Sequence, residues 1–262
     1  ALSPPLQHIT KTVCLLESRC DDYADYLRAI FRTREPHWNQ AIDQWNSEEC
    51  QHGVMLRRLS EATDKAFPFD LSMAEYESHV SYHEANGESV RGSVAAEMVS
   101  RCVVEALASA LYRVLSDAIE ERSAASVFAA LAQDEARHFG MFLKMLEMES
   151  ESNEVGFLAR LRFAMSRMFE LEDSQIIVAS CVIAGRSTKR IRLRREANEY
   201  LASLYALYRW KHLRYAAKML LRTVGARPRK LTLTAATSVL WIGVRFRGLV
   251  ASSSRLLFPA AR

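Results

Sequence analysis

Apolar residues recur every three or four positions along most of the chain, the spacing that places them on one face of a helix. In the first segment this pattern runs from Leu6 to Phe31 and stops before Pro36, a residue that cannot continue a helix. The same spacing predicts further helices near residues 38–63, 93–121, 123–149, 157–172, 174–185 and 189–224, with a short helix inside a connection over 67–92 and a final segment after Pro228. The alternation typical of strands does not occur over any useful length, so the predicted fold class is all-α.

The composition agrees with a helical chain, because only 9 Gly and 6 Pro interrupt 262 residues. With 49% hydrophobic residues the chain can form either one sizeable core or a core plus an appendage. We expect two parts: residues 1–180 form a four-helix bundle, and residues 181–262 form a helical extension packed on or beside it.

The pattern Glu-x-x-His occurs twice, at residues 49–52 and 135–138. Residues three apart on a helix share a face, so each copy can direct a carboxylate and an imidazole at one metal ion. A helix with a candidate inward Glu precedes each copy, 32 residues earlier in the first case and 30 in the second. The predicted metal ligands are therefore Glu17, Glu49, His52, Glu105, Glu135 and His138.

One Glu from each of two helices and Glu-x-x-His from two others is the ligand plan of ferritin-like di-iron bundles. This oxygen-rich set favours two iron ions, or manganese in place of one or both, over structural zinc. Glu97 is a rival to Glu105 because it lies eight residues earlier on a similar helix face. The distance to the second motif favours Glu105.

The residues around both motifs resemble the soluble acyl-carrier-protein desaturases, the type 2 fatty acid desaturases. Residues 45–53, Trp-Asn-Ser-Glu-Glu-Cys-Gln-His-Gly, are similar to that family's Trp-x-x-Glu-Glu-x-x-His-Gly signature. Residues 134–138, Asp-Glu-Ala-Arg-His, are similar to its Asp-Glu-x-Arg-His. The resemblance covers about residues 10–170.

The resemblance implies that Glu49 and Glu135 bridge two irons, while Glu17 with His52 and Glu105 with His138 complete the two ends. Asp134 would then hydrogen-bond a ligand His and fix its orientation. Trp45, one turn before the first motif, either walls the site or belongs to the core. The implied activity is O2-dependent desaturation of an acyl chain on acyl carrier protein, with electrons from a ferredoxin-type donor. We also expect a homodimer.

One departure keeps other reactions open. The plant enzymes of this family carry a Thr three residues after the third-helix Glu, where this chain has Ala108, and the nearest hydroxyl is that of Ser109. Some di-iron monooxygenases place their hydroxyl at the later position, so Ser109 is a candidate catalytic residue. Hydroxylation or N-oxygenation of a small or carrier-bound substrate is the alternative. An extra ligand from His79 or His83 would suggest N-oxygenation, although a solvated role suits both better.

A ferritin-like iron-storage protein is an alternative of another class. Storage requires a cage of short subunits, and the long C-terminal extension argues against it.

Charge is distributed unevenly along the chain. From Arg186 onward there are 18 Lys and Arg against only Glu196 and Glu199, whereas the preceding residues carry a net negative charge. The Arg residues at 190, 192, 194 and 195 form a cluster. Such a segment fits acyl carrier protein, which is acidic, or an anionic membrane surface. The 14 uncharged residues between Lys230 and Arg245 are too few for a standard membrane span, and no nucleic-acid-binding motif accompanies the charge.

Five Cys residues include no Cys-x-x-Cys pair, and their number is odd. They are expected to be reduced thiols in a cytoplasmic protein, peripheral to a membrane at most. No basic segment followed by an apolar run opens the chain, so no secretory signal is expected.

Overall fold

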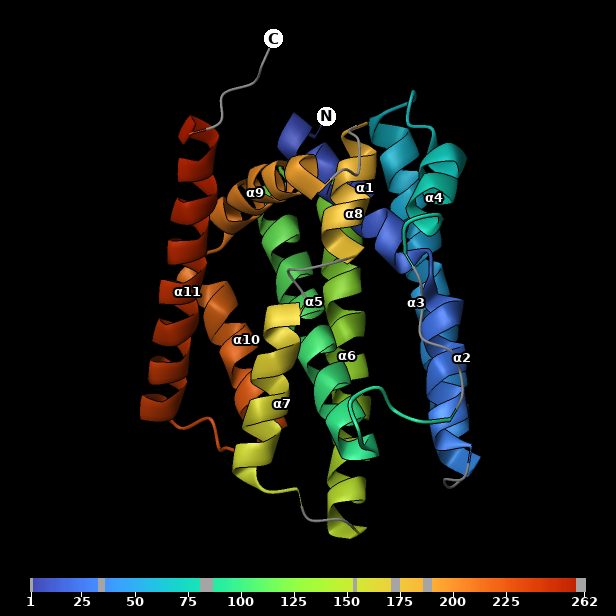
Figure 1. Ribbon diagram of the computed structural model, residues 1–262, viewed down its shortest axis with the longest axis vertical. Coiled ribbons are helices and arrows are strands. Elements are labelled where there is room, and N and C mark those ends of the chain that lie inside the picture. The colour runs from blue at the N-terminus through green and yellow to red at the C-terminus, as the bar shows by residue number, and fades with distance from the viewer. Residues whose placement is uncertain are drawn as a thin grey trace.

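Helices make up most of the chain in the computed structural model (Figure 1), which describes residues 2–32, 36–80, 87–152, 155–170, 175–185 and 190–257. These ranges contain no strand, so the predicted all-α fold class is confirmed. The helices are α1 (Pro4–Glu17), α2 (Cys20–Phe31), α3 (Pro36–Thr63), α4 (Phe69–Glu77), α5 (Val94–Ala118), α6 (Arg122–Ser152), α7 (Phe157–Glu170), α8 (Gln175–Ile183), α9 (Arg190–Leu207), α10 (Trp210–Thr223) and α11 (Lys230–Leu257).

The centre of the molecule is a bundle of four rods, namely α1 continued by α2, then α3, α5 and α6. The contact between α5 and α6 is the most extensive, and α3 packs against α1, α2 and α6. Helices α10 and α11 lie on the side opposite to α2 and α3 (Figure 1), where α10 packs against α5 and α11 packs against α9 and α10.

Two clusters of buried apolar side chains fill the bundle. One draws on α2 and the first half of α5, including Leu27 and Met98. The other draws on α1 and the second half of α5, including Leu15 and Leu115. The middle of α5 therefore lies between two apolar regions, where buried polar side chains form a separate layer.

The predicted single helix over 6–31 is wrong, because the structure has a break at Ser18 and Arg19 between α1 and α2. Ser18 has φ −73° and ψ 0°, and its hydroxyl donates to the carbonyl of Cys14 at 2.7 Å. Side-chain bonds of this type compete with the helical ladder. The apolar spacing continues through the break, which is why the sequence pattern did not reveal it.

The predicted helix over 189–224 is likewise divided, into α9 and α10. Arg209 adopts an extended conformation with φ −112° and ψ 160°, and its backbone N–H donates to Nδ1 of His212 at 3.1 Å. The other ring nitrogen of His212 lies 2.7 Å from Oδ2 of Asp117 on α5. The turn is therefore fixed by a residue of α10 that is itself held by the bundle.

Helix α11 packs on α9 and α10 with one face and leaves the other exposed. Among its exposed apolar residues are Leu231, Val239, Ile242, Phe246, Leu249 and Val250. Residues Lys230–Ser253 have a mean hydropathy of 1.2 with 11% of an 18-residue window buried, so by length and composition alone this helix could cross a membrane. The sequence count that excluded a span ended at Arg245, whereas the apolar run resumes after Arg247.

The prediction of five reduced thiols is wrong for two of them, because Cys20 and Cys50 form a disulfide with a Cα–Cα distance of 5.7 Å. The break after α1 turns the start of α2 toward α3 and brings together two residues 30 positions apart. The other cysteines, Cys14, Cys102 and Cys181, are buried and reduced. The inference of a cytoplasmic location from reduced cysteines therefore loses its basis.

Candidate metal centre

The six residues that the motifs predicted as ligands meet in the polar layer of the bundle. Their potential donor atoms form two overlapping groups, in each of which all donors lie within 4.8 Å of one another. One group consists of Glu17, Glu49, His52 and Glu135, and the other of Glu49, Glu105, Glu135 and His138. Glu49 and Glu135 belong to both groups, which is the position expected of carboxylates that bridge two ions.

The facing atoms of the site are close but not hydrogen-bonded. Nδ1 of His138 lies 2.9 Å from Oε1 of Glu49, and Nδ1 of His52 lies 3.2 Å from Oε1 of Glu135. All four atoms are buried without a hydrogen-bond partner of suitable geometry. Buried polar atoms in proteins are normally paired. Donor atoms that converge on common points without pairing fit metal ligands.

The electrostatics of the site agree with this fit. Burial, with repulsion from Glu49 and Glu135, raises the pKa of Glu17 well above its usual range. Burial and the charge of Glu135 do the same to the pKa of Glu105. Burial lowers the pKa of His52, but the carboxylates of Glu135 and Glu49 outweigh it and raise the pKa to about 11. In the absence of a metal, protons on these groups offset the charge of the buried carboxylates, and two divalent ions would take the place of those protons.

The outer nitrogens of the two imidazoles are held crosswise by acids that precede the motif glutamates. Nε2 of His52 lies 3.2 Å from Oδ2 of Asp134, and Nε2 of His138 lies 2.9 Å from Oε2 of Glu48. Arg137 pairs with both acids, donating to Glu48 at 3.1 Å and to Asp134. An N–H donated outward leaves Nδ1 of each ring free to bind a metal.

Sequence reasoning identified Asp134 but missed Glu48. The signal was present, because Glu48 stands before Glu49 as Asp134 stands before Glu135.

Glu17 owes its position to a close approach between α3 and the end of α1. A Cβ at Gly53 would lie 3.1 Å from both the carbonyl oxygen of Glu17 and Cα of Ser18, so only glycine fits without displacement. The hydroxyl of buried Tyr112 donates to Oε1 of Glu17. Tyr112 lies seven residues after Glu105 on the same face of α5, and sequence reasoning missed it.

Ser109 is buried but engaged elsewhere. Its hydroxyl donates to the carbonyl of Ala132 at 2.7 Å and lies 3.2 Å from the hydroxyl of Tyr215. Ala108, rather than Ser109, lines the cavity in front of the site. The catalytic role of Ser109 stays a prediction.

The remaining candidates have definite positions. Glu97 accepts hydrogen bonds from Tyr26 and Ser89 at 2.9 and 2.8 Å and is not in either ligand group. Trp45 is buried with its ring edge-on to that of His138, so it walls the site. His79 is exposed, and His83 lies outside the described residues.

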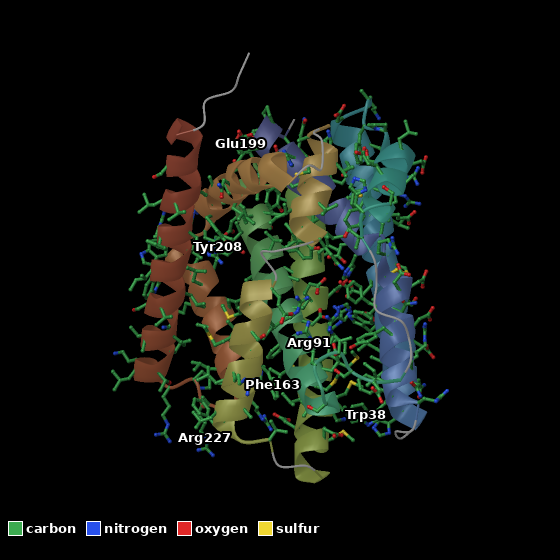
Figure 2. The ribbon with its side chains drawn as sticks, in the orientation of Figure 1. Trp38, Arg91, Phe163, Glu199, Tyr208 and Arg227 are labelled. Carbon is green, nitrogen blue, oxygen red and sulfur yellow. A yellow bond between two sulfur atoms is a disulfide. The ribbon has the colours of Figure 1, made fainter. Side chains whose placement is uncertain are left out.

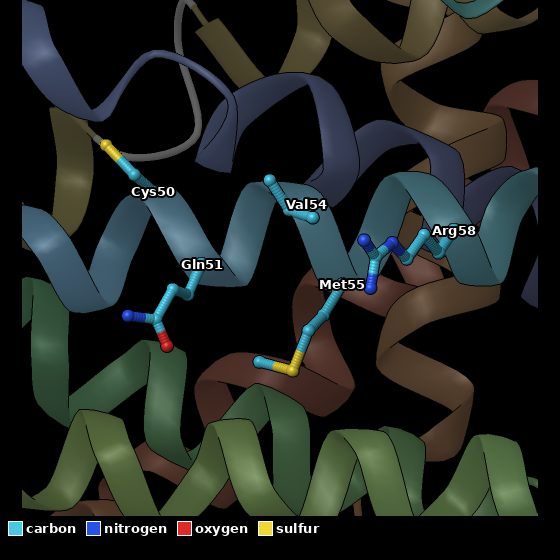
Figure 3. Close-up of a pocket in the computed structure, with 5 residues that line it drawn as sticks. All are labelled: Cys50, Gln51, Val54, Met55 and Arg58. Atoms are coloured by element: carbon cyan, nitrogen blue, oxygen red, sulfur yellow. The ribbon is translucent and has the colours of Figure 1, made fainter.

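A cavity of about 780 Å³ opens in front of the metal centre. Glu17, Glu49, Glu105 and Glu135 line it, together with mostly apolar side chains from α1, α2, α5 and α7–α11. Its volume lies within the range of sites for small organic ligands. A smaller depression of 340 Å³ on α3 is lined by Cys50, Gln51, Val54, Met55 and Arg58 (Figure 3) and contains no predicted ligand.

Comparison with known families adds one finding. The Rubrerythrin family model matches residues 99–174, a range that includes Glu105, Glu135 and His138. This match supports a di-iron protein of the ferritin-like superfamily and does not extend to the acyl-carrier-protein desaturases in particular. Comparison with curated proteins and with solved structures gave no significant match.

Proposed function

We propose that this protein is an O2-dependent di-iron oxidase that attacks a C–H bond of an acyl chain. The observation that carries the proposal is the joining of two features. Two ligand groups share Glu49 and Glu135, and a large, mostly apolar cavity ends on their carboxylates. An iron-storage protein has no use for such a cavity.

Glu17 and His52 would hold one iron, Glu105 and His138 would hold the other, and Glu49 and Glu135, which belong to both ligand groups, would serve both. When bound, the iron pair supplies O2 activation and the oxidising power for hydrogen abstraction. Oxygen-rich ligands also suit manganese, so metal analysis is part of the test.

The protein's own residues orient the ligand side chains and exclude water from the cavity. Asp134 and Glu48 fix the imidazoles, because each accepts from an outer ring nitrogen. The hydroxyl of Tyr112 donates a hydrogen bond to Oε1 of Glu17 and so fixes that carboxylate. The apolar walls of the cavity keep water from the reacting chain, which protects reactive species from side reactions.

Desaturation is the reaction that the resemblance around both motifs suggests, and hydroxylation or N-oxygenation is the alternative. Electrons would come from a ferredoxin-type protein. Delivery of the acyl chain on acyl carrier protein rests on the same resemblance. The acyl substrate is therefore supplied in two forms, as the free acid and bound to the carrier.

The decisive experiment reduces the iron-loaded protein, adds O2 with dodecanoate or dodecanoyl carrier protein, and analyses the acyl products by mass spectrometry. A chain lighter by two hydrogens indicates desaturation, and one heavier by an oxygen atom indicates hydroxylation. The native protein should hold close to two irons per chain, and Glu135→Ala or His138→Ala should lose most of that iron. Full iron content in a Glu49→Ala, Glu135→Ala double variant would disprove the site assignment.

A further inference from the structure

Three arginines surround one part of the cavity, close to the metal centre. Arg91, Arg101 and Arg167 all line it, and they come from the segment before α5, from α5 itself and from α7. Figure 2 shows Arg91 near the middle of the molecule. Arg101 has 5% of its surface exposed, and its guanidinium lies over the ring of Tyr23.

The described acids near these arginines compensate them only in part. Glu97 lies 3.7 Å from Nε of Arg101 and 4.0 Å from Nε of Arg91, but its Oε2 already accepts from Tyr26 and Ser89. Glu170 is exposed and lies 2.8 Å from Arg91 and 3.8 Å from Arg167. Three cations therefore face two acids within the part of the chain that the structure describes.

The donors of this cluster are also incompletely used. Nε of Arg91, of Arg101 and of Arg167 is buried without a hydrogen-bond partner among the described residues. Burial, together with the charges of Arg101 and Arg91, lowers the pKa of Arg167 to about 10. A bound anion would accept hydrogen bonds from these arginines and offset the repulsion between their charges.

Helix α5 relates this cluster to the metal centre and to the apolar part of the cavity. Arg101 stands four residues before Glu105, while Ala108 and Leu111 stand three and six residues after it, and all four line the cavity. At a rise of about 1.5 Å per residue, Arg101 lies roughly 6 Å to one side of Glu105 and Leu111 roughly 9 Å to the other. The apolar part continues to Leu204 and Tyr208 and to Leu240 and Val244 on α11.

We propose that the cavity binds a free long-chain carboxylic acid, with its carboxylate on Arg91, Arg101 and Arg167 and its chain running past the metal centre toward α9 and α11. The inference rests on the proposed function for the reaction, but the binding site stands on its own residues. A monoanion fits best, because the described acids leave one positive charge uncompensated. The planar carboxylate also matches the fork of a guanidinium.

The test is binding, measured by calorimetry on the full-length protein under anaerobic conditions so that no turnover occurs. The probes are dodecanoate, dodecanol and dodecyl phosphate. Dodecanoate should bind at least about tenfold more tightly than dodecanol, since hydrogen bonds to a charged group are worth about that much. Tighter binding of dodecyl phosphate than of dodecanoate would contradict the proposal that the ligand is a carboxylate and would indicate a phosphate head group instead.

Variants on two helices keep the test independent of a local folding defect. Arg101→Gln and Arg167→Gln should each weaken dodecanoate binding by about tenfold and leave dodecanol binding unchanged. Arg101→Lys should lose less, because it keeps the charge. Arg113→Gln is the matched control, since Arg113 also lies on α5 but stacks on Tyr215 and does not line the cavity.

Equal affinity for acid and alcohol in the native protein would overturn the proposal, as would variants that lose both ligands alike. Failure of the oxidase proposal looks different. In that case the arginine-dependent binding of dodecanoate persists, but O2 yields no oxidised acid. Oxidised products without any preference for the acid would instead leave the oxidase standing and remove the anion site.

Discussion

Nε2 of His138 lies 2.9 Å from Oε2 of Glu48, the residue immediately before Glu49 in the other Glu-x-x-His motif. The reciprocal contact joins His52 to Asp134. Each motif therefore supplies one candidate ligand pair and orients the imidazole of the other. The two halves of the centre are therefore linked by contacts between α3 and α6. A substitution in one motif should lower the metal affinity of the position whose imidazole belongs to the other motif.

Glu48→Gln and Asp134→Asn should each weaken metal binding about 10- to 100-fold, the usual effect of losing an acid that orients a ligand His. Glu48→Gln should act first on the ion held with Glu105, and Asp134→Asn on the ion held with Glu17. Iron titration against a chelator measures both. Glu61→Gln on α3, whose partner is Arg57, is the control and should change nothing. Equal iron affinity in all three variants would contradict the crosswise arrangement.

Gly53→Ala should displace the end of α1 and with it Glu17, because the new Cβ would lie 3.1 Å from backbone atoms of Glu17 and Ser18. Overpacking of this kind costs about 1–3 kcal/mol. The melting temperature and the iron content should both fall. Gly140→Ala on α6 is the matched control, since its Cβ would meet no atom within 4 Å. An unaltered iron content in Gly53→Ala would show that Glu17 does not depend on this contact.

Tyr112→Phe and Ser109→Ala should have different consequences. Tyr112→Phe removes the donor to Glu17, so iron binding should weaken. Ser109→Ala removes a hydroxyl that donates to Ala132, three residues before Glu135, so turnover should fall while iron content is kept. Single-turnover rates and metal analysis of both variants separate the two effects. A Ser109→Ala enzyme with native turnover would exclude Ser109 from the mechanism.

Asp117 should contribute stability that disappears in acid. Hydrogen bonds and charge from Lys211 and His212 lower the pKa of Asp117 below its ordinary value of 3.8. The stabilisation is therefore complete above that value and is lost as the pH falls through the lowered pKa. Because the carboxylate is partly exposed, Asp117→Asn should cost only about 1 kcal/mol at pH 7. The melting temperatures of Asp117→Asn and of the native protein, measured from pH 2 to 7, should differ near neutrality and converge as the pH falls below 3.8.

The exposed apolar face of α11 should bind anionic vesicles. Ile242 and Phe246 are 65% and 64% exposed, and Arg245 and Arg247 flank Phe246. Ile242→Glu and Phe246→Glu should reduce vesicle binding, and salt should weaken it through the arginines. Leu71→Glu on α4, at a site 75% exposed, is the control. If the protein ignores vesicles but binds an acidic carrier protein in a salt-dependent way, this surface is a carrier site instead.

The cluster of Arg190, Arg192, Arg194 and Arg195 was also expected to contribute to such binding. Its side chains lie outside the described residues.

Patterns that lie within one helix were readable from the sequence. The two Glu-x-x-His motifs fixed which residues share a face, and the structure brings Glu17 and Glu105 to them. The break after Glu17 was not readable, because the apolar spacing runs through it, and the close approach of Gly53 to this break comes from another helix. The arginine cluster was hidden for a related reason. Arg91, Arg101 and Arg167 become neighbours only when α7 packs against α5.

The disulfide between Cys20 and Cys50 makes the two metal positions differ in the order in which they form and lose their ligands. One of its ends lies three residues after Glu17, and the other lies directly beside Glu49. Glu49 lies inside the loop of chain that this disulfide closes, and Glu17 and His52 lie three and two residues outside its two ends. Glu105 and His138, by contrast, meet only while α5 and α6 stay packed. When heat or denaturant loosens the bundle, the tethered half keeps its ligands within reach of one another. The ion beside Glu17 should therefore be the first to be captured during folding and the last to be released.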